Sequence, residues 1–290
     1  MFVSKELTLV LLAVYLIMLI LSKQFPMRIF ALISHWARWV SFACAFSLML
    51  TFFEWSNRPD WVHFVSGLAL WFVLETLFYK ISIHMLNISD MELFPKYKHD
   101  TNENLWPITK EVLQIKEFLS AEGFKSEEIL KAQIVSNITI RQAVFLDDSQ
   151  KIRLNVLFIP HANHETKLFY SLFSMQTSGE TLITDNQNMP FGGYYPENWT
   201  VNRFPVCHSL KQLLKKHREL VGEKKEALVA LNEDMRTNTN RLQWELEKKN
   251  REMGFLKIPD SEDKRRISPE GCFRIWTEMW LLAYFGKTLS

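Results

Sequence analysis

LTLVLLAVYLIMLILS, residues 7–22, is the first of three apolar stretches near the start of this chain. The second and third occupy residues 29–53 and 61–83, and no stretch of comparable length and apolarity follows them. A hydrocarbon core about 30 Å thick needs roughly 20 apolar residues to be crossed by a helix, whose backbone hydrogen bonds are all internal. The sequence therefore predicts an integral membrane protein with three transmembrane α-helices within residues 1–86, in contact with the lipid bilayer.

The first stretch is short enough to be compared with a cleavable signal peptide. Only one basic residue, Lys5, precedes the stretch, and it lies next to Glu6. The bulky segment KQFPMRIF follows the stretch in place of a small-x-small cleavage site. We therefore expect an uncleaved membrane anchor.

Positive charges in the short connections predict the orientation. Lys23 and Arg28 lie between the first two stretches, and Lys80, Lys96 and Lys98 lie at or after the end of the third. Short cytoplasmic connections carry an excess of Lys and Arg. The N-terminus is therefore predicted outside and the C-terminal part in the cytoplasm, with the plasma (inner) membrane as the expected location.

Two charged residues lie deep within the second and third stretches. Arg38 is nine residues past position 29 and Glu75 eight residues before position 83, so each lies about 12 to 14 Å from the cytoplasmic end of its helix. An ionisable group at this depth costs a few kcal/mol unless it is paired or hydrated. We predict that Arg38 and Glu75 pair across adjacent helices in a structural role. The alternative is a proton or ion path that includes His35 and His63.

The central part of the chain predicts a soluble α+β domain. Residues 87–107 are polar, contain two prolines and are expected to form a linker. An amphipathic helix is predicted before Gly123, and Ser209 is a good N-cap for a second helix. Between them, period-2 patterns predict strands at residues 131–146, 152–160, 168–176 and 181–184. We therefore expect a four-stranded antiparallel sheet within residues 108–221, flanked by helices and covered on one face.

The C-terminal part predicts a helical tail. Residues 222–258 are expected to form a long charged helix, whose interrupted apolar stripe leaves homo-oligomerisation possible. Residues 259–290 are expected to form a charged linker and an amphipathic helix that is too short and too charged to span a membrane. This last helix is predicted either to lie in the membrane interface or to dock on protein.

One loop of the predicted domain has the composition of a binding surface. Aromatic residues with polar tips bury a large area while keeping hydrogen-bonding capacity, and glycines permit unusual backbone angles. The predicted binding loop consists of Phe191, Gly192, Gly193, Tyr194, Tyr195 and Trp199. The alternative is a rigid loop that packs its own aromatic residues over the sheet edge.

A second loop contains the only weak candidates for metal ligands. His161, His164 and Glu165 lie within five residues, but in a predicted polar turn that does not hold them on one face of a helix or strand. A solvated loop is the expected structure, so no metal and no cofactor are predicted.

The remaining patterns restrict the function. The formal net charge of +2 gives no basic surface of the kind that binds nucleic acid, and the sequence contains no G-x-S-x-G or H-E-x-x-H motif. We therefore expect a membrane-anchored binding or adaptor protein that contacts a protein partner through the 191–199 loop or the helical tail. The alternatives are a transport or sensor component that uses the intramembrane ionisable residues and, last, a membrane-proximal enzyme with no catalytic residue identified.

Overall fold

The computed structural model describes residues 5–24, 28–101, 110–136, 138–160, 166–224, 227–231, 233–257 and 266–289. The chain forms two compact units. The membrane unit comprises Met1–Asn87, Pro190–Gly192 and Cys272–Leu289. The sheet unit comprises Ile88–Met189 and Gly193–Gly271.

Three helices of the membrane unit are long and apolar enough to cross a membrane, which confirms the predicted candidate spans. They are α1 (Lys5–Gln24), α2 (Arg28–Phe52) and α3 (Asp60–Ile88). Most of the apolar side chains of α1 and α3 are exposed, as expected of surfaces that face lipid. The third helix continues five residues past the predicted end at position 83.

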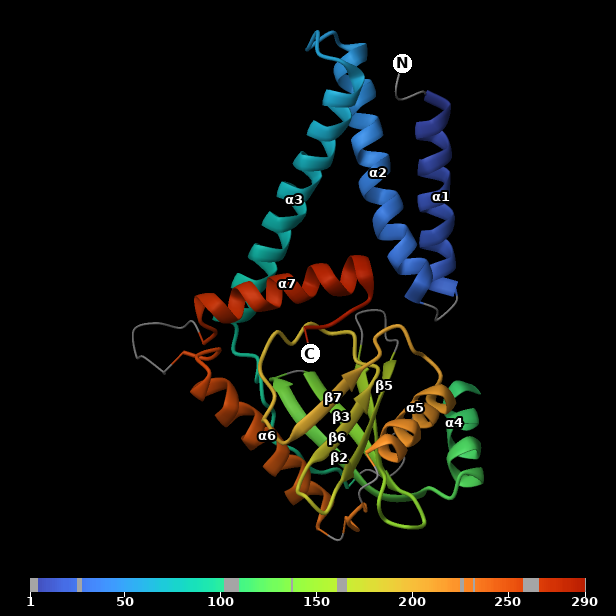
Figure 1. The fold of residues 1–290 in the computed structure, drawn as a ribbon, viewed down its shortest axis with the longest axis vertical. Helices are drawn as coiled ribbons and strands as arrows, with labels where there is room; N and C mark the ends of the chain where they lie inside the picture. The colour runs from blue at the N-terminus through green and yellow to red at the C-terminus, as the bar shows by residue number, and fades with distance from the viewer. Residues whose placement is uncertain are drawn as a thin grey trace. The chain divides into compact units, whose positions relative to one another are not determined.

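Small residues bring α2 and α3 together. A Cβ atom on Gly67 of α3 would lie 2.9 Å from the Cα atom of Ala43 of α2, so the two helices approach more closely than a larger residue permits. Further along, Trp39 Nε1 donates to Leu68 O at 3.0 Å. From there α2 and α3 diverge, and residues 272–285 of α7 (Pro269–Phe285) cross beside them (Figure 1).

Aromatic side chains attach α7 to the two spans. The ring of Tyr284 lies 5.2 Å from those of Trp36 and Trp39, and the ring of Trp280 lies 5.5 Å from that of Tyr79. Trp36 Nε1 also donates to Tyr284 O at 2.9 Å. These contacts pack α7 on α2 and α3 within the membrane unit.

The sheet unit contains a mixed sheet of seven strands in the described residues, in the order β1 to β7. Strands β1 to β6 are antiparallel, and β6 and β7 are parallel. The strands are β1 (Lys98–His99), β2 (Lys125–Val135), β3 (Ile138–Leu146), β4 (Arg153–Pro160), β5 (Thr166–Met175), β6 (Thr181–Asp185) and β7 (Trp199–Arg203).

The predicted four-stranded sheet was therefore wrong in its strand number. The segment 131–146 was taken as one strand, but β2 ends at Val135 and β3 begins at Ile138, and these two residues pair. The other two missed strands are short. Strand β1 lies in the predicted linker, and β7, where Trp199 and Val201 alternate with polar residues, lies at the end of the predicted binding loop.

Helices cover both faces of the sheet, whereas one covered face was expected. Side chains alternate across a strand, so Ala143 and Phe145 of β3 pack with α4 and α5, while Val144 and Leu146 pack with α6. The helices are α4 (Lys110–Ala121), α5 (Leu210–Glu223) and α6 (Met235–Glu252) (Figure 1).

The second covered face results from a break in the predicted long charged helix. Helix α5 ends at Glu223, and Val229 N then donates to Met175 O at the end of β5 at 2.8 Å. Asp234 caps a new helix, α6, by accepting from Thr237 N at 2.8 Å. The break lets the chain pass the end of β5 and place α6 on the opposite face of the sheet from α5.

Candidate functional site

A chamber of about 140 Å³ lies between the sheet and α6 within the sheet unit. Strands β3 to β7 contribute one wall, and α6 contributes Thr239, Leu242, Gln243 and Leu246. The wall from the sheet combines apolar side chains such as Leu157 and Phe173 with the polar side chains of Gln142, Arg153 and Asn155. A mostly apolar cavity with a few placed polar groups is the usual form of a small-molecule site.

Arg153, the first residue of β4, is the charged group of the chamber and is 2% exposed. Its Nη1 donates to Asn238 Oδ1 at 2.5 Å, and its guanidinium carbon lies 4.4 Å from the ring centroid of Phe173. In the described residues no carboxylate forms an ion pair with it, and its Nε has no hydrogen-bond partner. Burial, with a smaller contribution from Arg241, lowers the pKa of Arg153 to about 10, so the side chain is a cation at neutral pH.

Four other chamber side chains also have a buried polar atom without a partner in the described structure. These atoms are Gln142 Nε2, Asn155 Oδ1, Trp199 Nε1 and Thr239 Oγ1. A buried polar atom left without a hydrogen bond costs about 1 to 3 kcal/mol. Five such atoms, with Arg153 Nε, therefore belong to side chains that line one small space.

The sequence analysis identified only Trp199 among these residues. It placed Trp199 in a loop, whereas the structure places it at the start of β7, where it lines the chamber. For Arg153 and Asn155 the sequence contains a pattern, because these two residues alternate with Leu154 and Val156 in β4. With one covered face expected, this alternation does not distinguish a solvated face from the wall of a chamber.

The predicted binding loop is divided between the two units. Within the membrane unit, Phe191 N donates to Glu278 Oε2 at 2.9 Å and Gly192 N donates to the same oxygen. Arg274 Nε donates to Gly192 O at 2.6 Å. Two successive backbone N–H groups thus bind a carboxylate of α7, as anion-binding backbone nests do.

The rest of the predicted loop belongs to the sheet unit. Tyr194 N donates to Asn250 Oδ1 and Asn250 Nδ2 donates to Tyr194 O, both at 2.9 Å. The Tyr194 hydroxyl donates to Glu270 Oε1 at 2.7 Å. Gly193 is buried and Tyr195 is half-buried. Much of the loop backbone is therefore engaged in intramolecular hydrogen bonds.

Replacing Gly192 with alanine is expected to destabilise the membrane unit by about 2 kcal/mol. Gly192 has φ +67°, and an added Cβ would lie 2.7 Å from the backbone nitrogen of Ile275. Gly179→Ala is the matched control, because Gly179 has φ +85° but no atom within 4 Å of an added Cβ. Thermal unfolding of the full chain in detergent micelles measures both variants. Equal losses would show that backbone strain alone, without the α7 contact, accounts for the effect.

The structure brings Arg38 and Glu75 together. Arg38 Nη2 lies 2.9 Å from Glu75 Oε1, and the Glu75 side chain is 5% exposed. The same carboxylate accepts from Tyr79 OH at 2.8 Å, from Trp71 Nε1 at 2.7 Å and from the hydroxyl of Tyr284 of α7. Four donors thus surround one carboxylate, three of which the sequence analysis did not identify.

The two histidines of the alternative ion path are not hydrogen-bonded to this carboxylate. His35 Nδ1 lies 3.1 Å from Ala31 O in its own helix. His63 is buried with no partner for either ring nitrogen in the described structure. It precedes Glu75 by twelve residues in α3, which corresponds to about 18 Å along the helix.

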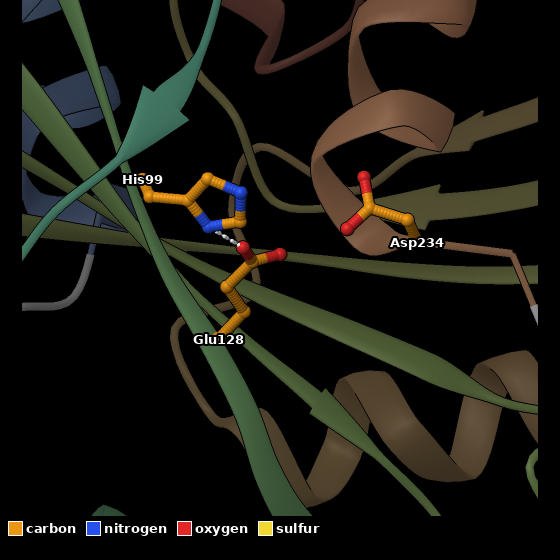
Figure 2. A group of neighbouring side chains, drawn as sticks. All are labelled: His99, Glu128 and Asp234. Carbon is orange, nitrogen blue, oxygen red and sulfur yellow. Dashed lines mark ion pairs between the residues drawn. The ribbon is translucent and has the colours of Figure 1, made fainter.

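The weak metal candidates His161, His164 and Glu165 lie outside the described residues. Another group that could hold a divalent cation consists of His99 of β1, Glu128 of β2 and Asp234, whose ligand atoms lie within 4.8 Å of one another (Figure 2). His99 and Glu128 form an ion pair. Asp234 Oδ2 accepts from both the backbone N and Oγ1 of Thr237, which lowers its pKa. The ion pair and the helix cap account for these three side chains without a metal.

His217 of α5 is completely buried on the other face of the sheet. Its Nε2 lies 3.0 Å from Ser174 Oγ and its Nδ1 lies 2.9 Å from Thr184 Oγ1. Burial lowers the pKa of His217 to about 4, so its ring is neutral at neutral pH. Because all three side chains are at most 1% exposed, this group is inaccessible to a substrate and stabilises the packing of α5 on the sheet.

In comparisons with known proteins, no family model, no curated protein and no solved structure matches this chain.

Proposed function

We propose that this chain is a membrane-anchored binding protein whose sheet unit holds a small molecule in the chamber beside α6. The observation that carries the proposal is a space of about 140 Å³ lined by five side chains that each have a buried polar atom without a partner in the described structure. Nine residues connect the end of α3 at Ile88 to the start of β1 at Lys98. A short segment of the chain therefore joins the candidate spans to the sheet unit.

The free-energy cost of leaving buried polar atoms unpaired favours the binding of a ligand that pairs with them. Each atom left unpaired costs about 1 to 3 kcal/mol, so a molecule that pairs with several of them binds with a substantial part of that energy recovered. Aromatic and aliphatic side chains, including Phe169, Phe173 and Leu157, supply the apolar contact area. This combination of a few polar groups on an apolar wall gives both affinity and orientation.

A small molecule replaces the protein partner that the sequence analysis expected at the 191–199 loop. The Phe191 and Gly192 N–H groups bind Glu278, and the backbone N–H and C=O of Tyr194 bind Asn250, so these groups do not present a recognition surface. Trp199 of the predicted loop lines the chamber instead. We retain the proposed orientation, with the N-terminus outside and the sheet unit in the cytoplasm at the inner membrane.

The arrangement of Glu75 favours an anchoring role for the membrane unit over ion transport. Its two carboxylate oxygens already accept from Arg38, Trp71, Tyr79 and Tyr284. A carboxylate with four fixed donors is a structural centre that holds α2, α3 and α7 together. A proton path would need further carboxylate or histidine side chains in hydrogen-bond contact with it.

The test compares a variant that fills the chamber with one that does not. Ser171→Leu places an isobutyl group in the chamber wall, and Ser126→Leu makes the same change at an exposed position of β2. Small molecules are extracted from each purified full-length protein and quantified by mass spectrometry. We expect one compound near equimolar amount in the wild type and in Ser126→Leu, and at least about tenfold less in Ser171→Leu. Equal amounts in all three proteins, or none in the wild type, would contradict the proposal.

A further inference from the structure

We infer that the molecule bound in the chamber carries an anionic group, a carboxylate or a phosphate, and that Arg153 binds this group. The inference rests on the proposed function, because it specifies the ligand of the same chamber. It depends on three independent features: the charge balance around Arg153, the excess of hydrogen-bond donors, and the size of the space.

No carboxylate of the described residues pairs directly with Arg153. A buried charge is costly unless it is paired and hydrogen-bonded. Arg153 Nη1 donates to the neutral amide oxygen of Asn238. Glu233 is the nearby acid, but its Oε2 accepts from Asn238 Nδ2 at 2.6 Å and from Arg241 Nη2 at 3.3 Å. Arg241 Nη1 also donates to Glu245 Oε1 at 2.7 Å. Both acids therefore pair with Arg241, and neither forms an ion pair with the guanidinium of Arg153.

The unpaired atoms of the chamber are mostly hydrogen-bond donors. Arg153 Nε, Gln142 Nε2 and Trp199 Nε1 can only donate, whereas Thr239 Oγ1 can donate or accept and Asn155 Oδ1 accepts. An ionised carboxylate or phosphate is an acceptor-only group with several lone pairs. It therefore complements this set better than a hydroxyl, an amide or a cation. Asn155 Oδ1 remains for a hydroxyl or N–H group elsewhere on the ligand.

The size of the chamber limits the ligand to a small acid. A dry engineered cavity of about 150 Å³ binds benzene, and the chamber volume is about 140 Å³. A carboxylate or phosphate on Arg153 leaves room for a compact body against Phe169, Phe173 and Trp199. The structure thus assigns the site to small organic acids or inorganic phosphate, and not to long lipid chains.

The experiment measures the binding of three probes to the full-length protein in detergent micelles. Sodium benzoate carries a carboxylate, benzamide is its neutral counterpart, and inorganic phosphate represents the other anion. The change in tryptophan fluorescence and isothermal titration calorimetry give the dissociation constants. We expect one of the two anions to bind at least about tenfold more tightly than benzamide, because charge-assisted hydrogen bonds are the stronger ones.

Variants at Arg153 test whether the guanidinium is responsible. Arg153→Met removes the charge at similar length and is expected to weaken binding of the preferred anion by at least about tenfold while leaving benzamide unchanged. Arg153→Lys keeps the charge but lacks the planar guanidinium group. It is the variant to measure if Arg153→Met does not fold. Arg236→Met removes an exposed arginine of α6 that does not line the chamber and is the matched control.

The outcomes separate this inference from the proposed function. Tighter binding of benzoate than of phosphate indicates a carboxylate ligand, and the reverse order indicates a phosphate. Benzamide binding as tightly as either anion, or anion binding unaffected at Arg153, overturns the anion inference while the chamber remains a binding site. If no probe binds at millimolar concentration and the wild type contains no bound compound, the chamber is filled only by water and both proposals fail.

Discussion

Replacing Glu75 with alanine is expected to lower the free energy of unfolding of the membrane unit by about 3 kcal/mol. The substitution removes the acceptor of four donors that come from α2, α3 and α7: Arg38, Trp71, Tyr79 and Tyr284. Removing one partner of a buried ion pair costs about 3 to 5 kcal/mol in general. The lower end applies because the Arg38 side chain is 34% exposed and retains part of its hydration.

Thermal unfolding in detergent micelles measures the effect of the Glu75 substitution. Glu75→Gln keeps oxygen and volume at the site and is expected to lose less than Glu75→Ala. Lys80→Ala, at an exposed position of the same helix, is the matched control and should leave the transition unchanged. If Glu75→Ala unfolds at the same temperature as Lys80→Ala, the carboxylate is not a structural centre, and a functional role in the membrane becomes the better hypothesis.

The stability of the sheet unit is expected to fall by about 3 kcal/mol between pH 6.5 and pH 4 because of His217. The pKa of this ring falls from 6.5 to about 4 on folding because burial disfavours the charged form. In this pH range the unfolded chain therefore binds a proton that the folded chain does not. The contribution of His217 is complete above pH 6.5 and is lost progressively as the pH falls towards 4.

Unfolding temperatures of the full chain at pH 7.5 and pH 5 measure this dependence. His217→Gln should be less stable than the wild type at pH 7.5, because the contacts with Ser174 and Thr184 change, but should lose less stability on acidification. His99→Gln is the control, since the His99 side chain is about half exposed. An acid dependence in His217→Gln equal to that of the wild type would assign the effect to other titrating groups.

The membrane unit was the more predictable part of the chain. Helical rise and bilayer thickness are the same in every sequence, so the positions of Arg38 and Glu75 along their stretches were enough to predict their pairing. The contribution of Tyr284 could not be predicted in this way. It lies 209 residues from Glu75 in the sequence, and no local pattern specifies which helix faces such a distant one.

The chamber shows where prediction from local pattern failed in the sheet unit. Arg153 and Asn155 occupy alternate positions in β4, which is typical of a strand with one solvated face. They are covered by α6 because helix α5 ends at Glu223 and the chain then passes the end of β5 near Val229. The same alternation is compatible with both arrangements, so the sequence pattern alone did not distinguish a solvated surface from the wall of a chamber.

The sequence by itself determined the three apolar helices, the depth of the paired charges in them and the presence of a strand-rich body flanked by helices. These depend on residue type and on periods of two or 3.6 residues, which act over one turn or one strand. Only the tertiary structure decided that the described part of the body has seven strands, that α6 covers the second face of the sheet, and that a cation with no directly paired carboxylate in the described residues lies beneath it. Those features arise from contacts between segments distant in the chain, where long-range packing overrides local preference.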